Sequence, residues 1–194
     1  MNLTPRFSRR TVLALSAAAA AVLLPAVALA SSAGSETASA PATAGRCVES
    51  DLTDWIGVPG NGTAGSNYYE LEISDTSSAT CTLYGFPGVS ALGPGGVRLG
   101  SAAGRNSGYG KEQLITLQQG ETAHVVLQIT DTGNYPPSQC RAKKADALQV
   151  YAPGAYRAKK IPFSFEACSK SGPVYLHVST SIAGTGIPGY SIGE

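Results

Sequence analysis

The chain has 194 residues and a formal net charge of +1, and 14% of its residues are charged, while glycine (23) and proline (12) are frequent. The balanced charge excludes the strongly basic surface that nucleic-acid binding normally requires. The four cysteines and two histidines leave little material for a metal centre.

Residues 1–30 are predicted to be a signal peptide. Arginines precede an apolar run from Val12 to Leu29, and residues 28–30 (Ala-Leu-Ala) match the pattern that signal peptidase accepts, with cleavage after Ala30. The alternative is an uncleaved membrane anchor, because the run is nearly long enough to span a bilayer. Pro25 and the excess of alanine over leucine favour cleavage, after which no membrane span is expected.

The segment Ser8–Leu13 also resembles a twin-arginine signal, which would imply export of an already folded chain. Cleavage would remove three of the 14 basic residues, Arg6, Arg9 and Arg10, and leave 11 against 13 acidic ones. This slightly negative charge again argues against a nucleic-acid partner. We expect the mature protein to be secreted, extracellular or associated with the cell wall.

Residues 31–45 contain almost only small residues and proline, so we expect a flexible spacer there. A single domain should follow over residues 46–194. Its residues 69–73 and 122–130 alternate apolar and polar side chains, as half-buried strands do. Further strands are expected at 97–99, 114–117, 148–151, 161–165 and 174–178, and turns are expected at 57–66, 93–96, 100–110 and 133–138.

The strand expected at 161–165 contains Pro162, which favours an edge or irregular position. No segment shows a sustained helical period. Seven or eight short strands separated by turns predict an all-β domain, an immunoglobulin-like antiparallel β-sandwich.

The cysteines predict two disulfides. Cys47, Cys81, Cys140 and Cys168 form no Cys-x-x-Cys motif and no cluster with histidine, so neither metal binding nor thiol redox chemistry is indicated. An even number of cysteines in an exported chain favours disulfides. Three pairings are possible, and the sequence alone does not choose among them. We favour the sequential pairs Cys47–Cys81 and Cys140–Cys168.

The segment Thr76–Val89, with Thr80-Cys81-Thr82-Leu83-Tyr84-Gly85-Phe86-Pro87-Gly88-Val89 at its centre, resembles the signature of a secreted actinobacterial family catalogued as domain of unknown function 4232. A Leu-x-x-Gly turn at 117–120, the strand end at 151–153 and the cysteines follow in the same order, so the resemblance covers about 46–180. Asp75 and Gln119 depart from it. The resemblance implies an extracellular sandwich with no assigned activity.

Few residues are candidates for catalysis. His124 and His177 alternate with apolar residues and are expected to face solvent, and no Gly-x-Ser-x-Gly motif nominates a nucleophile. Glu70 and Glu72 would lie about 7 Å apart on one strand face, which suits an inverting glycosidase. A solvent-exposed outer face explains them more simply. We therefore expect a protein that is not an enzyme and has no catalytic residue, cofactor or metal, with a hydrolase at an unrecognised site as the alternative.

One charge pattern is unusual. Arg-Ala-Lys-Lys occurs at 141–144 and again at 157–160, on either side of the strand expected at 148–151. If the two tetrapeptides form neighbouring turns, they create one basic patch of Arg141, Lys143, Lys144, Arg157, Lys159 and Lys160. Two separate solvated turns are the simpler interpretation. The leading functional hypothesis is a monomeric binding or structural domain at the cell envelope, with an anionic wall polymer or an extracellular protein as its partner.

Overall fold

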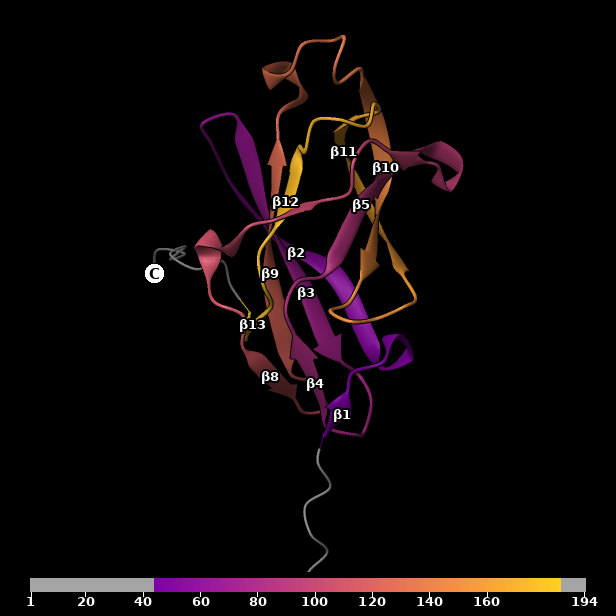
Figure 1. The fold of residues 1–194 in the computed structure, drawn as a ribbon. Coiled ribbons are helices and arrows are strands. Elements are labelled where there is room, and N and C mark those ends of the chain that lie inside the picture. The colour runs from indigo at the N-terminus through magenta and orange to yellow at the C-terminus, as the bar shows by residue number, and fades with distance from the viewer. Residues whose placement is uncertain (1–43, 186–194) are drawn as a thin grey trace, which may run out of the picture. The chain divides into compact units, whose positions relative to one another are not determined.

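The computed structural model describes residues 44–185, and this region contains strands and short 3-10 turns (Figure 1). The expected signal peptide, nearly all of the spacer and residues 186–194 lie outside it. No helix of the described region is long and apolar enough to cross a membrane. The strands are β1 (Gly45–Arg46), β2 (Leu52–Thr63), β3 (Ser66–Asp75), β4 (Cys81–Tyr84), β5 (Gly88–Leu92), β6 (Arg98–Leu99), β7 (Gly104–Arg105), β8 (Leu114–Leu117), β9 (Thr122–Thr130), β10 (Ala142–Tyr151), β11 (Lys159–Cys168), β12 (Leu176–Val178) and β13 (Ile182–Ala183).

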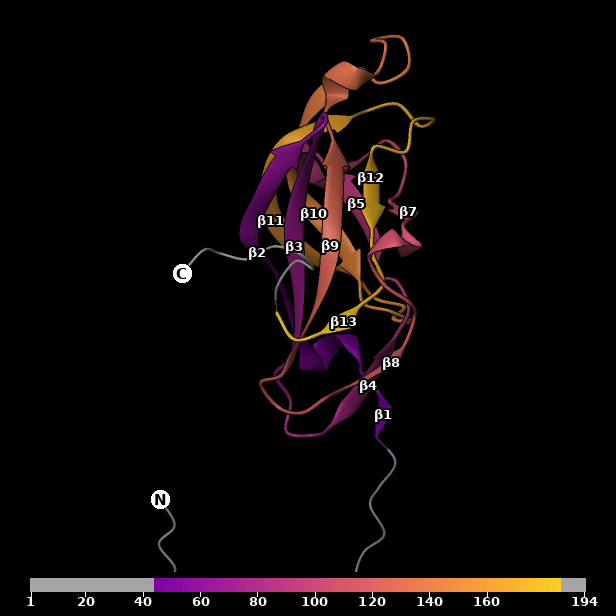
Figure 2. The same ribbon diagram turned by 90° about the vertical axis from the view of Figure 1, so that its left-hand side faces the viewer.

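These strands form three sheets. The largest has the order β2-β3-β9-β12-β7, with β13 also paired to β9; a four-stranded sheet has the order β11-β10-β5-β6; and β1-β4-β8 form a small third sheet. Figure 2 shows the two larger sheets as layers. Most pairs are antiparallel, but β1 pairs with β4, and β12 with β7, in parallel. The all-β prediction is confirmed, whereas a purely antiparallel arrangement of seven or eight strands is wrong.

One apolar core lies between the sheets. Alternate residues of β3 and β9 point into it, among them Leu71, Ile73 and Val125. Leu148 and Val150 of β10 enter the same core from the four-stranded sheet, which explains why the apolar positions of these strands have a period of two.

The longest alternating runs identified strands best. The expected strand at 122–130 coincides with β9, and that at 114–117 coincides with β8. The turn expected at 57–66 is wrong in extent, because β2 continues to Thr63 and the chain reverses at Ala64 and Gly65, which both have positive φ. Glycine-rich sequence in this case lies in an edge strand with irregular register.

The family-like segment carries the chain from one sheet to another. Cys81 to Tyr84 form β4, and β5 begins at Gly88 in the four-stranded sheet. Gly85 takes a positive φ of 91° between them, and its carbonyl accepts a hydrogen bond from the backbone N–H of Ser181. Leu83 is fully buried. These roles of Gly85 and Leu83 are structural.

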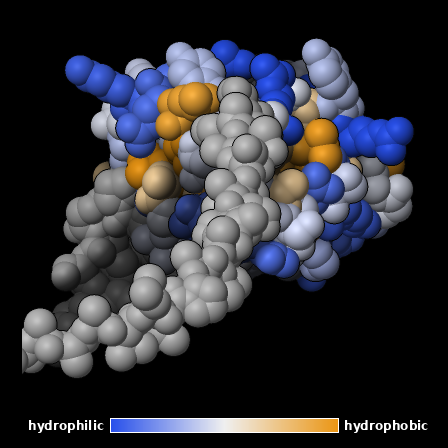
Figure 3. Space-filling model, turned by 90° about the horizontal axis from the view of Figure 1, so that it is seen from below, coloured by the Kyte–Doolittle hydropathy of each residue, from blue (hydrophilic) through white to orange (hydrophobic). Residues whose placement is uncertain are grey.

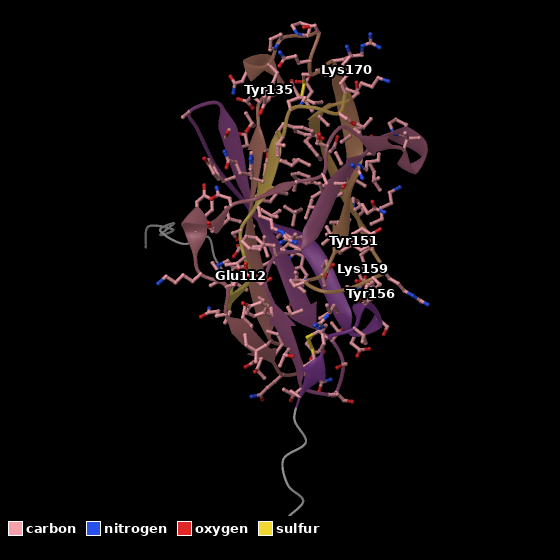
Figure 4. The ribbon with its side chains drawn as sticks, viewed as in Figure 1. Glu112, Tyr135, Tyr151, Tyr156, Lys159 and Lys170 are labelled. Carbon is pink, nitrogen blue, oxygen red and sulfur yellow. A yellow bond between two sulfur atoms is a disulfide. The ribbon has the colours of Figure 1, made fainter. Side chains whose placement is uncertain are left out.

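Two disulfides close the structure at opposite ends (Figure 4). Cys47–Cys81 joins the segment after β1 to β4, and Cys140–Cys168 joins the start of the β10–β11 hairpin to its end. These are the sequential pairs favoured from the sequence. No free cysteine is present among the described residues. Two disulfides indicate an oxidising compartment outside the cytoplasm.

Each disulfide is expected to raise the free energy of unfolding by about 2–4 kcal/mol, because it restricts the unfolded chain. The cysteines are 34 and 28 residues apart, so the two bonds should contribute similarly. Urea unfolding of two double variants, Cys47→Ala with Cys81→Ala and Cys140→Ala with Cys168→Ala, measures this. A loss below about 0.5 kcal/mol in either variant would contradict the prediction.

Candidate functional site

The structure does not bring the two basic tetrapeptides together. In the β10–β11 hairpin Lys143 is opposite Ala167, while Lys159 is opposite Val150. Lys159 and Ala167 are eight positions apart on β11, which is roughly 25 Å along a strand. Lys144 also lies directly opposite Glu166, which offsets its charge. The single basic patch predicted from the sequence is therefore wrong, because an antiparallel hairpin places segments on either side of one strand at its two ends.

Lys159 and its neighbour Lys160 belong to different faces. Lys159 lies opposite the buried Val150 and therefore points to the inner side of β11, whereas Lys160 is exposed. The Lys159 ammonium donates a hydrogen bond to the carbonyl of Leu52 at the start of β2. It also forms an ion pair with Glu49, with Nζ and Oε1 3.6 Å apart. Lys159 is thus a bridge between the two larger sheets rather than part of a surface patch.

Two carboxylates share this one ammonium. Glu49, from the 3-10 turn Glu49–Asp51, and Asp54 of β2 both lie near Lys159. Apart from the ion pair of Glu49 with Lys159, the buried oxygens of these two carboxylates have no partner. Burial raises the pKa of Asp54 to about 6, since the charge of Lys159 only partly offsets the loss of solvation. Burial likewise raises the pKa of Glu49. The cluster has an excess of negative charge when both carboxyls are ionised.

A pocket of about 300 Å³ opens beside this cluster. Its walls are the segment after β1, residues 46–49, and the turn between β10 and β11, residues 154–157. A guanidinium group stands on each wall: Arg46 and Arg157 are both exposed, and Arg46 donates a hydrogen bond to the carbonyl of Gly154. The disulfide at Cys47 fixes one wall and the hairpin fixes the other, so the pocket is built from anchored segments.

Tyr156 lies on the rim of this pocket and is 94% exposed. Figure 4 shows Tyr151, Lys159 and Tyr156 one below another on the right-hand side of the domain. Figure 3, viewed from below, shows hydrophobic surface among hydrophilic residues. An aromatic ring left in water beside a pocket and two guanidinium groups provides a stacking surface next to anion-binding donors.

A second polar cluster lies on the outer face of the six-stranded sheet. Glu70 and Glu72 of β3 are both buried, Glu72 to 3% exposure, and their side chains are hydrogen-bonded to each other. Gly57 of β2 leaves them room, because a Cβ there would lie 3.1 Å from Glu72 Oε1 and 3.3 Å from Glu70 Oε2. Burial, the charge of Glu70 and this hydrogen bond raise the pKa of Glu72 to about 8. The two carboxyl groups therefore share a proton at neutral pH.

His124 lies beside this pair, directly opposite Glu72 in the β3–β9 register. It is only 5% exposed, and its Nδ1 is 2.7 Å from the carbonyl oxygen of Gly184, in the chain that returns along β9 after β12. Its Nε2 and Glu72 Oε2 are buried without a hydrogen-bond partner. His177 is on the same face and is half-buried.

The expectation that Glu70, Glu72 and His124 face solvent is therefore wrong. Their alternation with apolar residues correctly assigned them to the outer face of the sheet, but it could not reveal that this face is covered. On the same face, the Tyr109 ring of the 3-10 turn Ser107–Tyr109 contacts the Tyr68 ring with 6.3 Å between centroids.

The carboxyl pair differs from an inverting glycosidase pair. Such enzymes hold their carboxyl groups about 6.5–9.5 Å apart to admit a water molecule, whereas Glu70 and Glu72 bond to each other. Among the described residues, no group of three or more His, Cys, Asp or Glu side chains could hold a metal ion. The pair is a proton-sharing group in a covered position.

Sequence reasoning missed Arg46, Glu49 and Asp54 as parts of a site. Arg46 comes immediately before Cys47, and the disulfide expected at Cys47 indicates that the segment around Arg46 is held in place. Glu49 and Asp54 give no such signal, because their burial depends on Lys159, which is more than 100 residues away in the sequence.

The fold and these sites define a disulfide-bonded all-β domain with a surface pocket at one end. Residues 47–181 match the family model described as Domain of unknown function (DUF4232), and the chain belongs to this family. The resemblance to domain of unknown function 4232 is thereby confirmed over residues 47–181. A comparison with curated proteins gave no match.

The raised pKa of Glu72 predicts a pH-dependent stability. In the folded state Glu72 keeps its proton up to about pH 8, whereas in the unfolded state it loses this proton above about pH 4.5. The contribution of Glu72 to the free energy of unfolding is therefore greatest below about pH 4.5 and is lost as the pH rises through about 8. The slope of the unfolding free energy is at most about 1.4 kcal/mol per pH unit for one proton. Glu72→Gln should flatten this slope, as measured by urea unfolding between about pH 5 and 9.

The matched control is Glu112→Gln, at an exposed position labelled in Figure 4. This control should unfold with the same pH dependence as the unaltered protein. Equal slopes for Glu72→Gln and the unaltered protein would show that the carboxyl pair does not share a proton.

Proposed function

We propose that this domain is a secreted, non-enzymatic binding module at the cell envelope of an actinobacterium, with an immunoglobulin-like sandwich as its scaffold. The observation that carries the proposal is the pocket between residues 46–49 and 154–157, with an almost fully exposed tyrosine on its rim. A concave site beside an amphipathic aromatic side chain is a common setting for ligand binding. The two disulfides support an extracellular setting.

The chemistry of the pocket favours an anionic glycan or another anionic wall polymer. Guanidinium groups bind phosphate or carboxylate in a bidentate manner, and Arg46 and Arg157 supply one from each wall. The ring of Tyr156 offers a flat apolar surface that suits the face of a sugar. A ligand that combines negative charge with a ring satisfies all three side chains.

A hydrolase remains the second candidate. The observation in its favour is the buried group of Glu70, Glu72 and His124, in which Glu72 and His124 each retain an unpartnered polar atom. It is less well supported, because the two carboxyl groups bond to each other instead of flanking a substrate. Release of soluble fragments from purified cell wall by the unaltered protein, abolished in Glu72→Gln, would establish it.

The binding proposal predicts that Arg46→Gln together with Arg157→Gln weakens retention on purified cell wall by about ten-fold or more, since charge-assisted contacts are lost. The measurement is co-sedimentation with purified wall over a salt series. Binding by the unaltered protein should weaken as salt rises, because the arginines are exposed.

The control variant is Lys143→Gln together with Lys144→Gln, which removes the same charge at the other end of the hairpin. It should bind as the unaltered protein does. Equal losses of cell-wall binding in the two double variants would show that binding depends on net charge alone and would contradict a site at the pocket. Full retention of the arginine variant on cell wall would contradict it as well.

A further inference from the structure

A second pocket, independent of the one proposed above, lies along the open edge of the two larger sheets. β2 ends the six-stranded sheet and β11 ends the four-stranded sheet, and the two strands lie side by side (Figure 2). A groove of about 490 Å³ runs between them, lined by residues 54–57 of β2, Tyr69 of β3 and residues 161–163 of β11. Since it lies between two edge strands, its walls belong to both sheets.

One wall of the groove is aromatic. The rings of Tyr69 and Phe163 meet edge to face, with 4.9 Å between their centroids, and Phe165 continues the row at 5.4 Å. Tyr69 and Phe163 are only partly buried against the core, so the groove reaches ring surface that the core does not cover. Such rings attract cations through their electron-rich faces and bury hydrocarbon chains equally well.

Asp54 lines one end of the groove, and its two carboxylate oxygens are buried there. Asp54 is opposite Ile73, a core residue, and therefore points to the inner side of β2, toward β11. Both of its carboxylate oxygens lack a hydrogen-bond donor. The charged groups that face it are Lys159 of β11 and Glu49 of the 3-10 turn, and Lys159 already bonds to Leu52 and Glu49.

This arrangement lacks one positive charge. Two carboxylates and one ammonium leave a net charge of −1, and a buried carboxylate without donors is costly unless a cation or a donor reaches it. A metal ion is less suited to the groove, because no group of three or more His, Cys, Asp or Glu side chains that could hold one occurs within residues 44–185. An organic cation fits, since its charge would meet Asp54 while its carbon atoms contact the rings.

We propose that the groove between β2 and β11 binds a primary alkylammonium group, such as the side chain of a diamino acid, with its nitrogen at Asp54 and its carbon chain against Tyr69 and Phe163. The Asp54 carboxylate accepts hydrogen bonds from the ammonium in a partly dry setting, where a charge-assisted bond is strong. Lys159, whose charge also acts on Asp54, is held by the carbonyl of Leu52 and by Glu49.

The test is a titration of the disulfide-bonded protein with n-butylammonium, followed by the backbone amide chemical shifts at about pH 8, where Asp54 is ionised. Saturable shifts at residues 54–57 and 161–163 are expected. Butan-1-ol, the neutral analogue, should bind at least about ten-fold more weakly, and Asp54→Asn should lose affinity by a similar factor. Binding by the unaltered protein should also weaken below about pH 6 as Asp54 takes up a proton.

Asp146→Asn, at an exposed position of β10, is the matched control and should bind as the unaltered protein does. Asp54→Asn is expected to fold, because it removes an uncompensated buried charge, and the chemical-shift spectrum verifies this directly. Absence of saturable shifts in the unaltered protein, or equal affinity of Asp54→Asn, would overturn the proposal. Retention on cell wall by Asp54→Asn reports separately on the pocket at residues 46–49 and 154–157.

Discussion

Lys159 joins two strands that belong to different sheets, and each of the two carboxyl groups that it faces lines a pocket, Glu49 the one and Asp54 the other. Its ammonium bonds to the Leu52 carbonyl where β2 begins and pairs with Glu49 in the preceding turn. On one side lies the pocket of residues 46–49 and 154–157; on the other, the groove between β2 and β11. Because one ammonium faces two buried carboxylates, the bridge leaves negative charge unbalanced at the groove.

The core and the disulfides hold in place the strands that line the two pockets. A single apolar core holds the sheets together, and the two disulfides secure opposite ends. Two carboxyl groups with raised pKa lie on opposite faces of the six-stranded sheet, Asp54 inside and Glu72 outside. Burying each of these carboxyl groups lowers the free energy of unfolding at neutral pH, and the core and the disulfides must offset this. Buried carboxyl groups with shifted pKa values are common at functional sites.

The sequence predicted what depends on local pattern. The period-two alternation of residues 122–130 identified β9, and the spacing and number of the cysteines led to two disulfides. It could not predict what depends on contacts between distant segments. Lys159 looked like one of six surface cations until the β10–β11 register turned it inward, and Glu72 and His124 looked exposed because alternation does not reveal what covers a face. The candidate pocket likewise joins residues 46–49 to a turn more than 100 residues later.

We expect the ligand to bind at the pocket whose walls are residues 46–49 and 154–157. The most direct measurement is a map of backbone amide chemical shifts on addition of soluble cell-wall fragments. The largest changes should cluster at residues 46–49 and 154–157, on the two walls of the pocket. Changes centred on Arg141–Lys144, at the other end of the hairpin, or on the outer face around Glu72 and His124 would contradict it.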